Sequence, residues 1–586
     1  MTELDAPNLN SLWATLLIEE LVRQGAGYFV LPSGSRSAPL TAAVAARREA
    51  AAIHHFDERG AAFHALGWGR ATGRPAVLIT TSGTAVANAW PAVVEASMDR
   101  VPLILLTADR PPELRDTGAS QTIDQAKIYA PYARWQIDLP CPDRAIRPEM
   151  ILTTVDQAVY RARRSPQGPV HINCMFREPL APIPQGEDYT GYLAGLAHWR
   201  QTHAPFTDYP VPDTICADPP LKALAETLGR VQRGLVVIGS LGDPQQLPSI
   251  RKLVGKLGWP VLPDISSGLR LGNADSPMIP HADAILAAKE FPDRNRAAAV
   301  LHLGGRLLSK RLLDYLQGCG PRPYIAVEDH PARSDPLHAV SLRVDGHVGR
   351  FCDSLVPYLR PRGNREWLDG WREASRRVGK ALDGLDGGEL SEPLVARIVS
   401  KLIGSDHGLF LAASMPVRDV DTFAVANGAS PLVACNRGAV GIDGILATAT
   451  GFARGLERPV TVLMGDLALL HDLNSLNFLR TVNVPMVVVV LNNNGGGIFS
   501  FLPIAQFRDV FEPYFGTPHN LTFEGAARMF EVNYDHPTTG KTFAEAYEQA
   551  LRNQRASLIE VTTTREENHQ LHLSLLDTVV SSLKGS

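Results

Sequence analysis

Residues 460–503 carry the clearest alternation of hydrophobic and polar segments in the chain. The apolar run 462–464 ends at Gly465, and a helical pattern of apolar residues begins at Asp466. A second apolar run, 486–491, is almost wholly β-branched and leads into a loop rich in Asn and Gly. Uninterrupted apolar runs are typical of strands that are covered on both faces in a parallel sheet. The pattern therefore predicts a strand, a helix, a second strand and a polar loop.

The same plan recurs in the first third of the chain. Residues 75–80 and 101–107 are apolar runs, and a loop of small residues between them opens a helical pattern. A third series of strand and helix patterns begins at Gly234. Alternating strands and helices predict parallel sheets with helices on both faces, and the two similar halves indicate a duplication. We therefore predict an α/β protein with three doubly wound parallel-sheet domains, at residues 1–185, 220–362 and 363–586, and a Pro-rich linker at residues 186–219.

Composition and charge narrow the class of protein. A chain of 586 residues is too long for one hydrophobic core, and 45% hydrophobic with 20% charged residues is typical of a globular protein. A net charge of −4 gives no general attraction to nucleic acid. No apolar run approaches the roughly 18 residues of a membrane span, and the polar N-terminus does not resemble a secretory signal. The six cysteines are widely spaced without a CxxC pair, which predicts a reducing, cytoplasmic compartment.

Oxygen-bearing residues follow both strands of the 460–503 segment. Asp466 offers a carboxylate, Asn493 a side-chain carbonyl and Gly495 a backbone carbonyl. Open α/β sheets bind ligands at the carboxyl ends of their strands, oxygen ligands suit Mg²⁺, and glycines let the backbone approach a diphosphate closely. We predict a Mg²⁺–diphosphate site at these three residues. The alternative is that Gly-Asp only ends a strand and the Asn/Gly run is a flexible turn.

This pair of motifs resembles the Gly-Asp-x and Asn-Asn motif of thiamine-diphosphate (ThDP)-dependent enzymes, although Leu467 stands where the broad motif usually has Gly. Further segments extend the resemblance, over essentially the whole chain, to the 2-succinyl-5-enolpyruvyl-6-hydroxy-3-cyclohexene-1-carboxylate (SEPHCHC) synthase family of these enzymes. The matching segments, in order, are PSGSRSAPL, HHFDERG, TSGTAVANAWPAV, LTADRPPELRDTGASQ, SKRLL, SMPVRD, NRGAVGIDG, GDLALLHDLNSL and NNNGGGIFSFLP. Nine segments in one order are far more specific than any single motif.

The resemblance implies a cofactor, a metal and an assembly. The domain order would be pyrimidine-binding, middle and diphosphate-binding, with ThDP between two subunits of a homodimer or a dimer of dimers. Glu58 would hydrogen-bond the aminopyrimidine ring, and Ile442 would be the wedge that bends the cofactor. Mg²⁺, with Mn²⁺ as an alternative, would bind Asp466, Asn493 and Gly495. The other cofactor contacts implied are Thr81, Ser82, Gly83, Asp443, Gly465 and Leu467.

The resemblance also implies a reaction. It is the decarboxylation of 2-oxoglutarate and the 1,4-addition of the resulting carbanion equivalent to isochorismate, which gives SEPHCHC and CO₂ in menaquinone or phylloquinone biosynthesis. Both substrates carry carboxylates, and arginine suits carboxylates because it binds them through two parallel hydrogen bonds. Arg437 is expected to act in catalysis as well as in binding. The substrate-binding residues implied are Ser35, Arg36, Arg110, Gln121, Lys310, Arg311, Ser414, Arg418 and Arg437, with an apolar wall of Ile498, Phe499 and Leu502.

Three other functions agree less well with the residues of the chain. Another ThDP-dependent decarboxylase or carboligase, similar to acetohydroxyacid synthase, would not need so many basic residues. A catalytically silent scaffold would not need Glu58, Asp466 and Asn493. A nicotinamide dehydrogenase would use the glycines at 239 and 242 of the middle region, but the full GxGxxG spacing is absent there.

Overall fold

The structure is a computed structural model that describes residues 6–212, 214, 217–273, 277–360 and 365–584. The chain forms two compact units. Unit 1 comprises Met1–Pro212, Asn436–Glu457 and His471–Asn483, and unit 2 comprises Asp213–Cys435, Arg458–Leu470 and Val484–Ser586. The domain boundary predicted at residues 362–363 lies outside the described residues.

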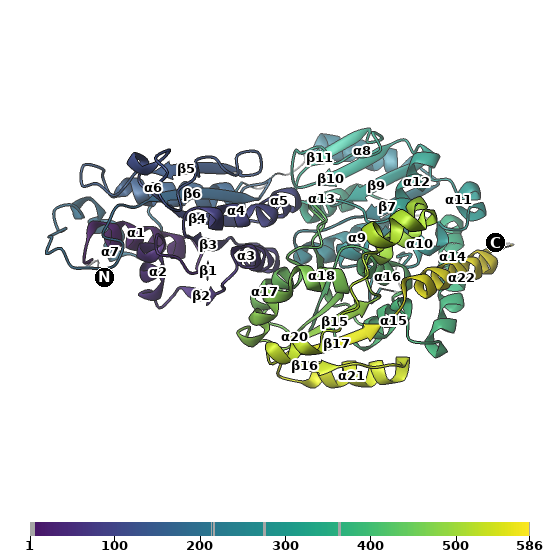
Figure 1. The fold of residues 1–586 in the computed structure, drawn as a ribbon. Helices are drawn as coiled ribbons and strands as arrows, with labels where there is room; N and C mark the ends of the chain where they lie inside the picture. Colours follow the sequence, from purple (N-terminus) through teal and green to yellow (C-terminus); the bar gives the residue numbers. More distant parts are fainter. Residues whose placement is uncertain (1–5, 213, 215–216, 274–276, 361–364, 585–586) are drawn as a thin grey trace. The chain divides into compact units, whose positions relative to one another are not determined.

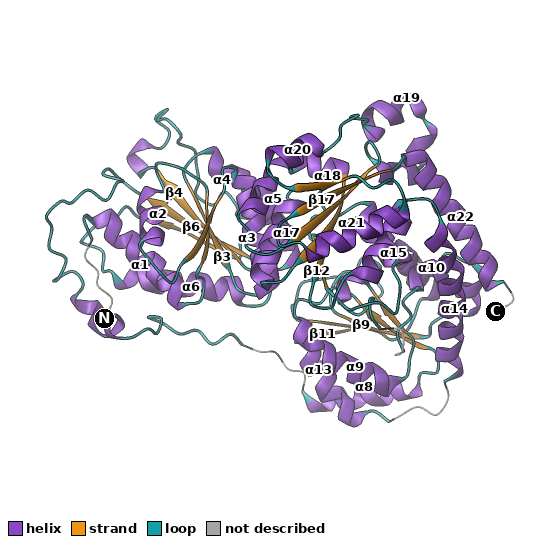
Figure 2. Ribbon diagram, turned by 90° about the horizontal axis from the view of Figure 1, so that it is seen from below, coloured by secondary structure: helices purple, strands orange, loops and turns teal. Residues whose placement is uncertain are grey.

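Unit 1 is built on a wholly parallel six-stranded sheet, sheet A, with the order β2-β1-β3-β4-β6-β5 (Figure 1). Its strands are β1 (Tyr28–Leu31), β2 (Ala51–His54), β3 (Ala76–Thr80), β4 (Leu103–Asp109), β5 (Trp135–Leu139) and β6 (Pro169–Met175). Figure 2 shows these strands lying between helices on either side. The helices are α1 (Leu9–Arg23), α2 (Ala38–Ala45), α3 (Glu58–Thr72), α4 (Thr84–Asn88), α5 (Trp90–Asp99), α6 (Glu149–Arg163) and α7 (Ala197–Gln201).

Helix α3 shows how local sequence sets the position of a predicted site residue. The Asp57 side chain caps the helix by accepting a hydrogen bond from the Arg59 N–H at 2.9 Å, as Asp commonly does at this position. The helix ends at Gly73, whose φ of +67° is the left-handed conformation that favours glycine. Glu58 is therefore the first residue of α3.

Unit 1 also contains α17 (Ile445–Leu456), which packs closely against α3. A Cβ atom on Gly67 of α3 would lie 1.9 Å from the Thr448 carbonyl oxygen, and one on Gly451 of α17 would lie 1.9 Å from the His64 carbonyl oxygen. Only glycine permits this approach of two backbones. His64 is buried beside these glycines and joins β1, α3 and α17, because its ring nitrogens contact the Tyr28 hydroxyl and the Thr450 hydroxyl, each at 2.8 Å.

Unit 2 contains two more parallel sheets. Sheet B has the order β11-β10-β9-β7-β8, and sheet C has the order β13-β12-β14-β15-β17-β16. The strands of sheet B are β7 (Gly234–Ile238), β8 (Val261–Pro263), β9 (Ala299–Leu303), β10 (Tyr324–Glu328) and β11 (Leu342–Asp345). Those of sheet C are β12 (Gly408–Leu411), β13 (Leu432–Cys435), β14 (Val460–Gly465), β15 (Met486–Asn492), β16 (Asn533–Asp535) and β17 (Ser557–Thr562).

Sheets A and C have the same topology. If the strands of each sheet are numbered from its first strand, both follow the order 2-1-3-4-6-5. The strand pairs β3/β4 and β14/β15 occupy equivalent central positions, and they are the two segments whose patterns match in the sequence. The shared topology supports the duplication that the sequence indicates, and the predicted α/β class with three parallel sheets is confirmed.

The helices of unit 2 follow the strands in alternation. They are α8 (Asp218–Arg230), α9 (Leu247–Leu257), α10 (Ala282–Ile285), α11 (Glu290–Arg294), α12 (Lys310–Cys319), α13 (Val348–Leu355), α14 (Glu366–Leu382), α15 (Glu392–Leu402), α16 (Met415–Phe423), α18 (Asp466–His471), α19 (Arg508–Phe511), α20 (Glu524–Met529), α21 (Gly540–Arg552) and α22 (Arg565–Leu583). Helix α14 follows residue 363 in sequence but packs on sheet B, where the Trp367 indole donates a hydrogen bond to the Gly234 carbonyl at 2.8 Å.

Strands β5, β6, β11, β13 and β16 were not predicted as strands from the sequence. Of these, β5, β11 and β16 are edge strands of sheets A, B and C respectively. Their residues are largely half-buried or exposed, so they lack the apolar runs of the central strands. The apolar run 557–561 predicts a last strand that closes the sheet. The strand forms as β17, but it is not the edge of sheet C, because β16 pairs outside it.

Candidate active site

The predicted metal site lies at the carboxyl ends of two neighbouring strands in unit 2. Strands β14 and β15 pair in register, with Gly465 opposite Leu491. The residues that follow each strand, Asp466 and the Asn-rich loop, therefore leave the sheet at the same edge. Asp466 is also the first residue of α18, where the partial positive charge of a helix N-terminus favours a carboxylate.

Asp466 is buried and holds the Asn/Gly loop by hydrogen bonds. Its Oδ2 accepts a hydrogen bond from the Gly495 N–H at 2.8 Å and lies 3.1 Å from Nε2 of His519, and its Oδ1 accepts from the Leu467 N–H at 2.6 Å. Gly495 has a φ of +135°, and a Cβ atom there would lie 1.8 Å from the Gly516 carbonyl oxygen. Only glycine fits this position, so the loop can close on Asp466.

Asn493 is buried beside this carboxylate, and its two amide atoms have different surroundings. Its Nδ2 donates a hydrogen bond to Oε1 of Glu392 at 2.8 Å. Its Oδ1 is buried without a hydrogen-bond partner among the described residues. A buried acceptor without a partner is costly unless another ligand satisfies it. A divalent cation held by Asp466 and this oxygen meets that need.

These donors fit Mg²⁺. The Gly495 carbonyl accepts one hydrogen bond, from the Gly497 N–H at 3.0 Å, and keeps a second lone pair. One carboxylate with neutral oxygens is the kind of protein ligand set that Mg²⁺ takes when it also binds phosphates. The described residues contain no group of three or more His, Cys, Asp or Glu side chains that could hold a metal. A cation at this site therefore depends on the amide and backbone oxygens.

Several predicted substrate residues lie around helix α16 of unit 2. Ser414 precedes the helix with a φ of +72°, a strained conformation of the kind that occurs at functional sites. Arg418, one turn later, donates a hydrogen bond to the Ser414 carbonyl. Arg311 forms an ion pair with Asp283, and the Thr422 hydroxyl of α16 donates to the same carboxylate at 3.3 Å. Lys310 beside it is exposed.

The predicted apolar wall lies directly after the metal loop. Ile498 and Phe499 are half-buried in a short 3₁₀ turn, and the Phe499 ring packs edge-on against Phe515 at 5.5 Å between centroids. Leu502 is 47% exposed, although it is a large apolar residue. An exposed apolar side chain beside a polar loop is available to contact a ligand or a second subunit.

In unit 1, the predicted cofactor loop after β3 is joined to two predicted substrate residues. The Arg36 N–H donates a hydrogen bond to the Thr81 hydroxyl at 3.3 Å. The Ser82 hydroxyl donates to the Gln121 carbonyl at 3.0 Å, and Gly83 has a φ of +85°. These contacts bring together residues that are 45 and 39 positions apart in the sequence.

Arg36 differs from the solvated arginine that a simple turn would carry. It is 5% exposed, its Nη1 donates to the Phe176 carbonyl at 3.0 Å, and its Nη2 lies 3.5 Å from Glu178. Ser35 beside it is exposed, and Arg110 is half-buried after β4. Arg36 therefore contributes to the structure of unit 1 whether or not it also meets a substrate.

Glu58 and the NRGAVGIDG loop also lie in unit 1. Glu58 is half-buried, and the Asn88 amide donates a hydrogen bond to it at 3.5 Å. Arg437, Ile442 and Asp443 are half-buried in the loop between β13 and α17. Gly444 ends the loop against α3, because a Cβ atom there would lie 2.0 Å from the Phe63 ring.

Four residues that contact predicted site residues or the NRGAVGIDG loop were not predicted from the sequence. Glu392, His519 and Asp283 contact Asn493, Asp466 and Arg311 respectively, and Glu95 contacts the NRGAVGIDG loop. Glu392 had only the signal of a helix start, in Ser-Glu-Pro, and Glu95 lies two residues after a matching segment. The distances in sequence, 101 positions for Glu392 and 343 for Glu95, hide these contacts from any local pattern.

Comparison with known proteins identifies the family. Three family models match, namely the thiamine pyrophosphate enzyme N-terminal TPP-binding domain at residues 13–128, the middle domain at 190–411 and the C-terminal TPP-binding domain at 429–561. The chain is 51% identical to 2-succinyl-5-enolpyruvyl-6-hydroxy-3-cyclohexene-1-carboxylate synthase of Rubrobacter xylanophilus, over 97% of this chain and 98% of the relative. The chain belongs to this synthase family.

Two further relatives have the same name. The synthase of Salinibacter ruber is 47% identical over 97% of this chain and 96% of its own length, and that of Prosthecochloris aestuarii is 42% identical over 98% of both. The predicted family is therefore confirmed, and the chain is a ThDP-dependent enzyme of the transferase type that forms carbon–carbon bonds. The scaffold and dehydrogenase alternatives are excluded by this membership.

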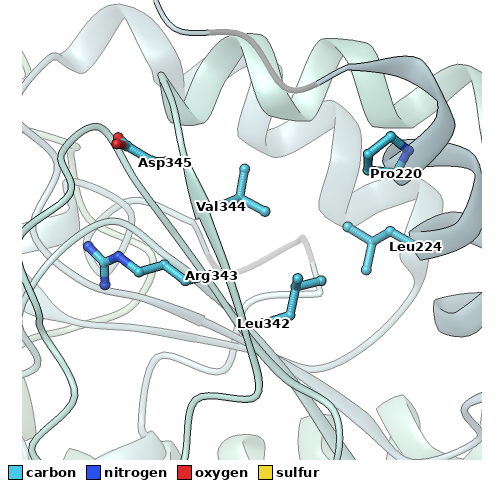
Figure 3. A pocket seen from close by; sticks show the side chains of 6 residues that line it. All are labelled: Pro220, Leu224, Leu342, Arg343, Val344 and Asp345. Atoms are coloured by element: carbon cyan, nitrogen blue, oxygen red, sulfur yellow. The ribbon is translucent and has the colours of Figure 1, made fainter.

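One cavity of the middle region is lined by none of the predicted site residues. A cavity of about 220 Å³ lies between α8 and β11 (Figure 3). It is lined by Pro220, Leu224, Leu342, Arg343, Val344 and Asp345. None of these is a predicted site residue. At the strand ends of sheet B, a Cβ atom on Gly239 would lie 2.1 Å from the Gly305 carbonyl oxygen, so the two glycine loops close on each other.

Within the described part of the chain, no helix has both the length and the apolar character to span a membrane.

Proposed function

We propose that this chain decarboxylates 2-oxoglutarate and adds the resulting four-carbon unit to isochorismate, forming SEPHCHC and CO₂ for menaquinone or phylloquinone biosynthesis. The observation that carries this proposal is the 51% identity, over nearly the whole of both chains, to a protein named as that synthase. ThDP, when bound, supplies the carbon nucleophile and accepts the electron pair left by the departing CO₂. The protein supplies binding, orientation and charge.

The proposed metal ligands are supported by the fit of their donor atoms, and the proposed cofactor contacts by the resemblance to the family. Asp466, the Asn493 Oδ1 and the Gly495 carbonyl would hold Mg²⁺, or Mn²⁺ in its place, and the metal would bind the diphosphate. Glu58 would hold a proton in a hydrogen bond to the aminopyrimidine ring, and Ile442 would press the cofactor into its bent form. Thr81, Ser82, Gly83, Asp443, Gly465 and Leu467 would complete the cofactor contacts.

The substrate carboxylates would bind the basic residues. Arg418 lies in α16, and Arg311 lies in α12. Both are half-buried, so they would meet a carboxylate with less competition from water than exposed side chains do. Arg437 would bind substrate and assist the addition. Ser35, Arg36, Arg110, Gln121, Lys310 and Ser414 would complete the polar surface, and Ile498, Phe499 and Leu502 the apolar one.

The assembly we propose is a homodimer or a dimer of dimers in the cytoplasm, with each cofactor between a pyrimidine domain (residues 1–185) and the diphosphate domain (363–586) of another copy. Large apolar side chains in residues 502–529 support a partner surface, since Phe507, Tyr514 and Met529 are 61%, 75% and 76% exposed. The described cysteines 141, 174, 319 and 352 are free thiols, which supports a reducing compartment.

The test is an assay of the purified protein with ThDP, Mg²⁺, 2-oxoglutarate and isochorismate, in which each component is omitted in turn. Isochorismate loss is followed by absorbance, and the product mass by mass spectrometry. We expect consumption only when all four are present. Decarboxylation of 2-oxoglutarate with isochorismate untouched would refute the acceptor, and use of pyruvate alone would favour the acetohydroxyacid synthase-like alternative.

A further inference from the structure

One buried carboxylate binds the backbone of the NRGAVGIDG loop. Glu95 lies in α5, is 3% exposed, and stands 343 positions before Gly438. Its Oε1 accepts a hydrogen bond from the Gly438 N–H at 2.8 Å, and its Oε2 accepts from the N–H groups of Ala439 at 2.6 Å and Val440 at 3.4 Å. Three successive backbone donors thus converge on one carboxylate, and hydrogen bonds to an ionised group are the stronger kind.

The loop is fitted closely to the end of α5. A Cβ atom on Gly438 would lie 2.6 Å from the Glu95 carbonyl oxygen and 3.0 Å from the Asp99 nitrogen. A larger residue could not approach the helix in this way. The first residue of the loop, Asn436, donates a hydrogen bond to the Thr448 hydroxyl at 2.9 Å, which attaches the start of the loop to α17.

The same loop contains a strained residue. Val440 has a φ of +65°, which is rare for a β-branched side chain. Such a conformation persists only where surrounding contacts over-determine it, and it occurs most often at functional sites. The Val440 N–H is itself one of the three donors to Glu95, so the carboxylate binds the strained residue directly.

We propose that Glu95 is a positioning residue for the reaction: by holding the 438–440 backbone, it orients Arg437 toward a substrate carboxylate and Ile442 toward the cofactor. The proposal rests on the proposed function for the roles of Arg437 and Ile442. Arg437 directly precedes the anchored backbone, and Ile442 follows it after Gly441, so the anchor constrains the direction of both.

The matched control for Glu95 is Asp99, one helical turn later. Its Oδ2 lies 2.6 Å from Nη1 of Arg70, and Arg70 Nη2 lies 3.8 Å from Glu95 Oε1. Asp99 belongs to the same charge cluster, but its carboxylate accepts none of the three loop N–H bonds. Replacing it with Asn removes a neighbouring negative charge, so this change does not disfavour the ionised form of the Glu95 carboxyl group.

The experiment compares Glu95→Gln, Glu95→Asp and Asp99→Asn by hydrogen exchange of the full-length protein. Gln keeps the size of Glu, but its side-chain amide has only one acceptor oxygen. Its NH₂ group would face one of the backbone N–H donors of the loop. We expect the 438–440 amides to exchange roughly tenfold or more faster in Glu95→Gln, less so in Glu95→Asp, and as in wild type in Asp99→Asn. Unchanged exchange in Glu95→Gln, or an equal increase throughout unit 1, would overturn the proposal.

Kinetics then separate positioning from structure. Glu95→Gln should raise the KM for 2-oxoglutarate about tenfold while its melting temperature stays near that of Asp99→Asn, and Glu95→Asp should recover part of the loss. If wild type does not use isochorismate, the proposed function fails, and ThDP affinity becomes the second measurement. Equal ThDP affinity in wild type and Glu95→Gln would then overturn the proposal.

Discussion

At the scale of single residues, the proposed metal site depends on which oxygen atoms remain available to bind a cation. The Asp466 carboxylate already accepts hydrogen bonds from Leu467, Gly495 and His519, which set its direction at the strand end. Asn493 is oriented by Glu392, because the bond to Nδ2 leaves Oδ1 directed elsewhere, where no described residue is its hydrogen-bond partner. Motif reasoning identified the two side chains proposed to bind the metal but not the residues that orient them.

Glu58→Gln should fold and bind ThDP but lose about 10²- to 10⁴-fold in kcat, because Gln cannot hold the proton in the hydrogen bond to the aminopyrimidine ring. Steady-state kinetics and ThDP titration by fluorescence measure the two effects. The control is Glu113→Gln, which removes an exposed carboxylate paired with Arg177 in the same unit. Normal turnover in Glu58→Gln would refute the assigned role.

Glu392→Ala should weaken Mn²⁺ binding in the presence of ThDP by about 10- to 100-fold, the usual effect of losing a partner that orients a metal ligand. The Asn493 amide is then free to turn its oxygen away from the metal. Electron paramagnetic resonance of Mn²⁺ gives the dissociation constant without an activity assay. Glu389→Ala, an exposed neighbour, is the control. Equal constants for both variants would show that Glu392 does not orient the ligand.

At the scale of elements, the packing of α3 on α17 places the first residue of α3 and the last residue of the NRGAVGIDG loop in one rigid arrangement. The glycines Gly67 and Gly451 allow the two helices to touch through their backbones. His64 lies between them, and burial lowers its pKa to about 3. It is therefore neutral in the folded protein at every pH at which the enzyme is expected to work.

His64→Gln should make unit 1 less sensitive to acid. The unfolded His64 takes up a proton below about pH 6.5, whereas the folded one does so only near 3, so its contribution to stability is complete above pH 6.5 and is lost as the pH falls. Between pH 6 and 4, wild type should lose about 1.4 kcal/mol per pH unit more than the variant. Urea unfolding of both proteins at each pH gives this difference, in which the other titrating groups cancel. Parallel curves would contradict the prediction.

At the scale of the whole molecule, the three parallel sheets and the repeated order of sheets A and C follow the pattern read from the sequence. Most inner strands were predicted because their buried apolar runs are local features of the sequence, although β6 was not. The edge strands β5, β11 and β16 were missed because half-exposed strands carry no such run. The same argument applies to the assembly, since exposed apolar residues reveal a partner surface only after the fold shows which residues are exposed.

Tyr514→Lys combined with Met529→Lys should convert the proposed dimer to a monomer and abolish activity, because two charges would be placed in an apolar interface. Light scattering after size exclusion measures the mass. Leu342→Lys, at an apolar residue that is 42% exposed on β11, is the control and should leave the mass unchanged. An unchanged mass in the double variant would place the interface elsewhere.

The sequence by itself determined the class of fold, the strand ends that carry oxygen ligands, and the family. Each of these depends on residues close together in the chain, where periodicity and spacing act directly. The tertiary structure alone decided which residues hold that chemistry in place: Glu392 lies 101 positions from Asn493, His519 lies 53 from Asp466, and Glu95 lies 343 from Gly438. The physical reason is that a buried carboxylate or imidazole finds its hydrogen-bond partners in space, and only the packed fold brings those partners within 3 Å or so.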